Sequence, residues 1–127
     1  MFAQVATASV AGIVSAAAQT FAGIKTFRDG LKVGSAGTLL TKMDRYSVSW
    51  TPSSVGANTT EEKTVTVSGL AVDDVVYVSP PASMPTGLGI GGCRVSATDT
   101  LAVIFINNTG GSLTPISGSY LVVAVRS

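Results

Sequence analysis

The residues best able to do chemistry in this chain are its carboxylates, and only two pairs of them are adjacent, Glu61–Glu62 and Asp73–Asp74. A glycosidase needs two carboxyl groups that face one substrate from opposed positions. Neighbouring residues on a strand point to opposite faces, so neither pair forms such a couple by itself. We therefore interpret both pairs as solvated charges at loops or strand edges. A calcium loop is not predicted either, because no D-x-D-x-D-G run occurs.

The other common catalytic groups are missing or isolated. Histidine is absent, which removes the usual general base near neutral pH, the partner of a serine nucleophile and a frequent metal ligand. Cys93 is the single cysteine, so it forms no internal disulfide, and we predict a buried structural cysteine on a strand. The run "GLGIGG" at 87–92 lacks the lysine of a phosphate-binding loop and is interpreted as a flexible loop. The sequence therefore predicts no enzyme, no metal site and no cofactor.

The composition favours a component of an assembly. Hydrophobic residues make up 46% of the 127 residues and charged residues 12%, whereas soluble domains carry about 25% charged residues. A chain with so little charge is expected to have part of its surface covered by other subunits. The net charge is +1 with no cluster of basic residues, so no nucleic-acid partner is predicted.

The first 24 residues carry no charge and are rich in alanine, as in "SVAGIVSAAAQ". No Lys or Arg precedes this run and polar residues interrupt it, which is untypical of a signal peptide. It is also a poor membrane span, because it is built mostly from Ala, Ser, Thr and Gly, and we predict no membrane partner. We expect the segment to pack closely on another protein surface.

From Tyr46 onward, short alternating or apolar runs are separated by turn-forming residues. "YSVSW", "KTVTVSGL", "DDVVYVS", "CRVSA", "TLAVIFIN" and "YLVVAVR" predict six strands, with a tight hairpin at Thr98–Asp99. We predict an all-β domain over 46–127, a small antiparallel β-sandwich or barrel. "LAVIFI" and "YLVVAV" are apolar on both faces and predict central strands buried on both sides. Two loops, 81–92 and 107–118, are expected to be exposed, with these candidate contact residues: Met84, Pro85, Leu88, Asn107 and Asn108.

Gln19 to Gly34, "QTFAGIKTFRDGLKVG", contains one short phrase twice, with Thr-Phe before a turn each time. In a strand, Phe21 and Phe27 would each point away from the preceding threonine. An extended strap that buries both phenylalanines against partner chains is one interpretation, and a hairpin that turns at Gly23 within the domain is the other. We favour the strap, because the segment holds few apolar partners of its own.

Two parts of the chain resemble proteins of tailed bacteriophages. "QTFAGIKTFRDGLKVG" is similar to a phrase near the base of many fibre and tail-spike proteins. "PSSVGANTTEEKTVTVSGLAVDDVVYVSPP" and the later "GLGIGGCRVSATDTLAVIFINNTGGSL" resemble a β-domain of virion proteins, including head fibres and capsid decoration proteins. The resemblance covers about residues 19 to 126. It implies a virion component without enzymatic activity, commonly trimeric, with the N-terminus on the particle and the β-domain outward.

This chain is much shorter than fibres that recognise hosts, and it has no long shaft. The resemblance therefore implies a trimeric cement protein or short head fibre that decorates and stabilises the capsid exterior. Residues 1–45 would form an extended N-terminal arm, and the partners would be the major capsid protein and the chain itself as a homotrimer. The expected capsid or trimer contacts are these apolar residues: Phe2, Val5, Val10, Ile13, Val14, Phe21, Ile24, Phe27 and Leu31.

Two alternatives remain open. A tail-fibre or tail-spike adaptor would place the outward loops against a host-surface glycan. A fibre-borne depolymerase would be an enzyme, and the missing acid pair and the short chain speak against it.

Overall fold

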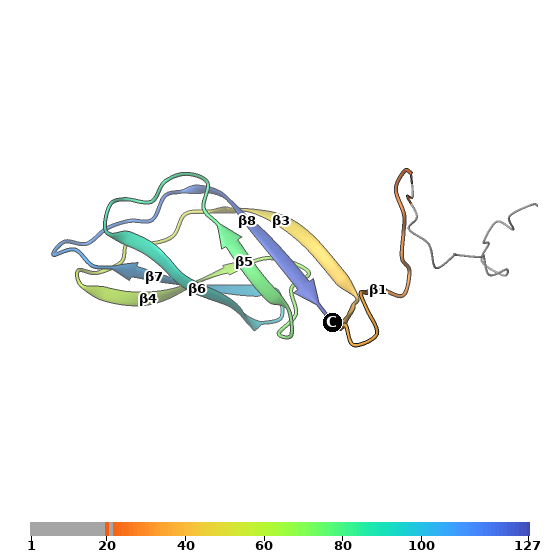
Figure 1. The fold of residues 1–127 in the computed structure, drawn as a ribbon. Coiled ribbons are helices and arrows are strands. Elements are labelled where there is room, and N and C mark those ends of the chain that lie inside the picture. Colours follow the sequence, from red (N-terminus) through yellow and green to blue (C-terminus); the bar gives the residue numbers. More distant parts are fainter. Residues whose placement is uncertain (1–19, 21) are drawn as a thin grey trace, which may run out of the picture.

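The computed structural model describes residue 20 and residues 22–127, and within them the chain is all-β with no helix. The sheets are antiparallel throughout (Figure 1). The strands are β1 (Leu31–Lys32), β2 (Leu39–Leu40), β3 (Lys42–Trp50), β4 (Thr59–Thr66), β5 (Val75–Ser79), β6 (Leu88–Ala97), β7 (Thr100–Asn107) and β8 (Gly118–Arg126).

Two three-stranded sheets form a small sandwich. One has the strand order β3-β8-β5 and the other β4-β7-β6. β7 and β8 are the central strands, as their apolar runs predicted. The two layers pack through the inward side chains of these central strands, with Leu101, Val103 and Phe105 from β7 buried with Tyr120 and Val122 from β8. The all-β sandwich predicted from the sequence is confirmed.

Aromatic packing joins the two layers. The Trp50 ring lies 5.7 Å from the Phe105 ring and 5.2 Å from the Tyr120 ring, between centroids. Phe105 and Tyr120 are fully buried. Burial of each large apolar side chain stabilises the fold by about 1.5–3 kcal/mol. The core therefore depends on residues from both sheets.

The prediction that the central strands are buried on both sides is wrong at two of their outward positions, although the outward Ala102 on β7 is buried. Ile106 on β7 is 43% exposed and Val123 on β8 is 36% exposed. A sandwich has two layers only, so the side chains on the outer face of each sheet are not covered by the other sheet.

The hairpin predicted at Thr98–Asp99 is present between β6 and β7. Asp99 has a φ of 59°, in the left-handed region that aspartate tolerates better than most residues. Its carboxylate accepts a hydrogen bond of 2.7 Å from the Gly69 backbone N–H, and its carbonyl accepts one of 2.8 Å from Val67. The tight turn therefore also holds the segment that leaves β4.

Four strands begin earlier than predicted: β4 starts at Thr59 instead of Lys63 and β8 at Gly118 instead of Tyr120, and the shifts of β3 and β6 are larger or as large. β3 starts at Lys42 instead of Tyr46, because β8 continues to Arg126 and pairs with β3 as far as Lys42. β6 starts at Leu88 instead of Cys93, so most of the glycine-rich run is strand and not loop. Pairing with β7 imposes this conformation, with a bulge between Ile90 and Gly92.

Residues 22–41, here called the N-terminal segment, lie outside the two layers and next to the C-terminus (Figure 1). No strand occurs between residues 22 and 30, so Thr26 and Phe27 do not form the alternating strand that was predicted. A short hairpin does form, but it pairs Leu31 with Leu40 and does not turn at Gly23. Gly30 precedes it with a φ of 96°, where a Cβ would come within 2.4 Å of the Leu40 carbonyl oxygen.

Candidate functional site

The carboxylates of β4 form ion pairs on opposite faces of the strand. Glu61 accepts hydrogen bonds of 2.7 Å from the Gly56 backbone N–H and from Lys63, and these donors lower the pKa of Glu61. Glu62 is paired with Arg94 across the outer face of the sheet, at 2.9 Å and 3.2 Å. The two carboxylates therefore do not face a common space.

Asp74 differs from the solvated charge that was predicted. Its side chain is buried, while Asp73 is exposed. Arg126 donates two hydrogen bonds to Asp74, one of them 2.9 Å long, and the Ala71 backbone N–H donates another of 2.9 Å. The Arg126 hydrogen bond is the main reason why the pKa of Asp74 is lowered. This pair connects the end of β8 to the turn before β5.

The thiol of Cys93 is half-buried on β6 and donates a hydrogen bond of 3.3 Å to the Val76 carbonyl. Burial raises the pKa of Cys93, which keeps the thiol protonated. In the described part of the chain, no three His, Cys, Asp or Glu residues gather as metal ligands would. Within the same residues, no helix has the length and hydrophobicity needed to cross a membrane.

The N-terminal segment exposes apolar side chains. Ile24 is 97% exposed, Phe27 62% and Leu31 44%. Val33 and Leu39, which the sequence analysis did not single out, are exposed as well. The remaining predicted contact residues lie outside the described residues: Phe2, Val5, Val10, Ile13, Val14 and Phe21.

A second apolar surface lies on the outer face of the β3-β8-β5 sheet, at the end where β3 begins, while exposed serines occupy the other end. Register places Met43, Val125 and Val75 in one row across the three strands. The next row is Arg45, Val123 and Tyr77. Met43, Val75 and Tyr77 are each at least 70% exposed. We call these five apolar residues the apolar outer face: Met43, Val75, Tyr77, Val123 and Val125.

The apolar outer face was missed from the sequence because β5 reads as apolar at every position except its end. Val76 and Val78 point inward, while Val75 and Tyr77 point outward. Alternation was therefore present, but hydrophobicity alone could not reveal which set of side chains the fold covers.

The two apolar surfaces meet at Met43. A hollow of about 480 Å³ lies between the N-terminal segment and the start of β3. It is lined by Lys25, Phe27, Gly30, Leu31, Leu40, Thr41, Lys42 and Met43. Met43 also belongs to the apolar outer face, so this one residue is common to the hollow that Phe27 lines and to the row that ends at Val75 on β5.

Of the five loop candidates, two are misplaced. Leu88 is buried because β6 begins there and its side chain joins the core. Asn107 is 1% exposed, at the inward-facing end of β7. Met84 and Pro85 are half-buried, and Asn108 is exposed as predicted.

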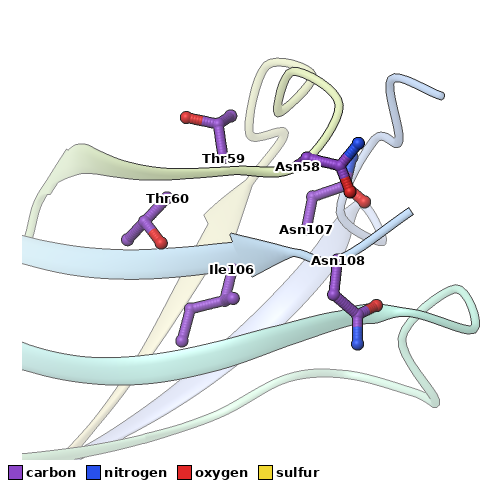
Figure 2. A pocket seen from close by; sticks show the side chains of 6 residues that line it. All are labelled: Asn58, Thr59, Thr60, Ile106, Asn107 and Asn108. Atoms are coloured by element: carbon purple, nitrogen blue, oxygen red, sulfur yellow. The ribbon is translucent and has the colours of Figure 1, made fainter. Parts of the chain in front are cut away.

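A shallow depression of about 430 Å³ lies at the opposite end of the sandwich from the N-terminal segment (Figures 1 and 2). Its lining comes from the start of β4, the end of β7 and the residues next to them: Asn58, Thr59, Thr60, Ile106, Asn107 and Asn108. Figure 2 shows Thr60, Ile106 and Asn108 on one side of the sheet, while Thr59 points to the other side.

Three comparisons with known proteins found no match. They covered protein-family models, curated proteins and solved structures. The functional interpretation therefore depends on the surfaces of this chain and on the phrases that resemble phage virion proteins.

The described surfaces are suited to binding. Exposed apolar side chains gain about 1.5–3 kcal/mol each when a partner buries them fully. Contiguous apolar patches of this kind mark interaction sites in soluble proteins. The carboxylates of the ion pairs above are already occupied by cationic partners, which leaves the apolar surfaces as the principal candidate site.

Proposed function

We propose that this protein is a structural component of a phage virion, a trimeric cement protein or short head fibre on the capsid exterior. The observation that carries the proposal is the exposure of apolar side chains on two surfaces that share Met43, with Phe27 on one and Tyr77 on the other. The assignment to a phage capsid comes from the sequence resemblance. The major capsid protein and further copies of the same chain are the proposed partners.

Attachment through the N-terminal part is supported by the exposure of Ile24, Phe27 and Leu31. An apolar segment that contacts several capsid subunits would clamp them together through avidity, without any catalytic step. Such clamping would stabilise the shell. The ion-paired carboxylates and the protonated thiol of Cys93 are consistent with a function without enzymatic activity.

Self-association is supported by the apolar outer face, where Arg45 is the one charged residue in the two rows described above. Depletion of charge at the centre of a patch is typical of protein interfaces. In a trimer, this face of each copy would be covered by a neighbour.

Binding to particles tests the proposal. Purified protein is mixed with capsids that lack it, the particles are sedimented, and the copies bound per major capsid subunit are counted. We expect a fixed ratio and greater heat resistance of the shell. Phe27→Ser combined with Leu31→Ser should reduce binding at least tenfold, because burial of both side chains is lost.

Ile106→Ser is the matched control, because Ile106 is 43% exposed and Leu31 44%, but they lie at opposite ends of the molecule. The control should bind capsids like the wild type. Equal binding by the Phe27→Ser/Leu31→Ser variant would exclude attachment through the N-terminal segment. Binding of a few copies, and only to particles with tails, would favour the adaptor.

The second candidate, a tail-fibre or tail-spike adaptor that touches a host-surface glycan, is favoured by one observation. The polar depression lies at the end of the sandwich that would face outward if the N-terminal segment faced the particle (Figure 1).

A further inference from the structure

The depression at the end opposite the N-terminal segment rests on a rigid scaffold. Asn107 Nδ2 donates hydrogen bonds to the carbonyls of Val55, Gly56 and Gly111, at 3.2, 2.9 and 2.8 Å. Its Oδ1 accepts bonds of 2.9 and 2.8 Å from the backbone N–H and the hydroxyl of Thr109. One buried side chain therefore holds the loops at this end together, and the depression does not need a ligand to form.

Backbone hydrogen bonds also fix the residues that line the depression. The Asn58 N–H donates to the Thr109 carbonyl at 2.9 Å, and the Asn108 N–H donates to the Gly87 carbonyl at 3.0 Å. Asn58 has a φ of 49°, a left-handed conformation that asparagine tolerates better than most residues. Both asparagine side chains are thus attached to a fixed backbone.

Apart from Asn107, the polar side chains of the lining are not used within the sandwich. Across the described residues, the side chains of Asn58, Thr60 and Asn108 make no hydrogen bond. Each amide offers two N–H donors and an acceptor oxygen, and the threonine hydroxyl offers both functions. The lining contains no charged residue. The depression therefore suits a neutral ligand with several hydroxyl groups.

Ile106 supplies the apolar part of the lining, next to glycines of β6. Ile106 is 43% exposed and its side chain lies over Gly91, where a Cβ would come within 2.6 Å of the isoleucine Cδ1. Gly89 pairs with Ile106 in the sheet, and a Cβ at Gly89 would meet nothing within 4 Å. Neither backbone strain nor internal packing requires glycine at Gly89. A strand glycine marks a bulge, a bend or close approach by a ligand, and the bulge of β6 comes after Gly89, between Ile90 and Gly92.

We infer that this depression is a binding site for a neutral saccharide. The C–H face of a sugar ring would pack on Ile106 beside the open strand at Gly89, and the amides of Asn58 and Asn108 would bond its hydroxyls. This site rests on the second candidate function, contact with a glycan, and specifies its residues. It does not depend on the decoration function, because it shares no residue with the N-terminal segment or the apolar outer face.

The test is an NMR titration of the ¹⁵N-labelled full chain with neutral probes. The probes are the methyl glycosides of glucose, galactose, mannose and rhamnose, and N-acetylglucosamine; glucuronic acid is the charged control. We expect at least one neutral probe to shift the side-chain amides of Asn58 and Asn108 and the N–H of Gly89 in a saturable way. Glucuronic acid should bind more weakly.

Variants locate the site. Asn58→Ala with Asn108→Ala should weaken binding at least tenfold, and Gly89→Val should abolish it by filling the open space. Thr60→Ala should weaken binding, whereas Thr64→Ala should not, although both threonines are exposed on the outer face of β4. Gly89→Val has room for its side chain, and an unchanged spectrum elsewhere will confirm that it folds.

The inference is overturned if no neutral probe produces a saturable shift at these residues, if glucuronic acid binds more tightly, or if the variants bind like the wild type. Capsid binding is measured separately with Phe27→Ser/Leu31→Ser. Loss of capsid binding in that variant with unchanged saccharide binding would show that the two functions fail independently.

Discussion

The two sheets of the sandwich expose outer faces of opposite character. The β4-β7-β6 sheet presents Thr60, Glu62 and Thr64, and the Glu62–Arg94 pair crosses its surface. The β3-β8-β5 sheet presents Met43, Val75 and Tyr77, each at least 70% exposed. Both faces belong to three-stranded antiparallel sheets that cover the same core. The contrast therefore does not arise from the fold, and it supports the proposal that a protein partner covers the β3-β8-β5 face.

Glycine use separates the two faces as well. β6 carries Gly89, Gly91 and Gly92 at one edge of the polar sheet. The corresponding edge strand of the apolar sheet, β5, is formed by valine, tyrosine and serine. Large side chains on β5 supply area for burial, whereas Gly89 and Gly92 on β6 leave open space above the backbone. The side chains of β5 suit the proposed contact with another protein chain, and the open space at Gly89 suits the proposed contact with a saccharide.

The largest expected effect comes from Phe105 on β7, whose ring packs against the other sheet. Phe105→Ala should destabilise the protein by about 3–5 kcal/mol, because it removes a fully buried ring that packs on Trp50. Urea unfolding measured by tryptophan fluorescence and by circular dichroism checks this. Coincident transitions would confirm one cooperative unit. Separate transitions would show that the two faces belong to layers that unfold independently.

A smaller effect is expected from placing charge on each outer face. Tyr77→Glu should weaken self-association by about 3 kcal/mol, because a carboxylate would be buried without a partner. Light scattering should give three times the mass of the 12.8 kDa chain for the wild type and a lower mass for the variant.

Thr64→Glu is the matched control on the polar face and should keep the wild-type mass. Equal masses for the two variants would contradict the assignment of the apolar outer face to self-association.

The smallest effect concerns two ion pairs, the pair of the buried Asp74 with Arg126 and the exposed pair of Glu62 with Arg94. Asp74→Asn should cost about 1.5–3 kcal/mol, because buried hydrogen bonds to a charged partner are weakened. Glu62→Gln, in the exposed pair, should cost less than about 1 kcal/mol. Urea unfolding at neutral pH gives both free-energy changes. Similar values would contradict the expectation that the buried pair stabilises the fold more than the exposed pair.

The pH dependence of the same variants sharpens this prediction. The pKa of Asp74 is lowered in the folded state from its ordinary value of 3.8. Its contribution is therefore fully present above about pH 4 and is lost as the pH falls toward the lower folded value. Asp74→Asn should have a flatter loss of stability in acid than the wild type.

Much of the fold could be predicted from the chain alone. Alternation in Tyr46, Val48 and Trp50 marked a strand with one buried face, and the continuous apolar run of β7 marked a central strand. The hairpin at Thr98–Asp99 followed from a two-residue gap between strands. These signals are local, because strand periodicity and turn chemistry act over a few residues.

The candidate sites were less predictable. Leu88 was expected in a loop because glycines surround it, yet pairing with Asn107 places it on a strand. Asn107 itself was expected to be exposed, because asparagine is frequent in loops. Its hydrogen bonds to Val55, Gly56 and Gly111 connect residues that are far apart in the sequence. No local pattern contains that information.

The sequence by itself determined that this protein is all-β, poor in charge and without histidine, because composition and periodicity are properties of the chain. Only the tertiary structure decided which apolar residues remain outside the core. Val76 and Tyr77 are neighbours on β5 and both are apolar. Val76 packs against the core because its side of the strand faces the second sheet, whereas Tyr77 points outward. That choice depends on the packing of two sheets from distant segments, so the apolar outer face and the polar depression became visible only in the folded molecule.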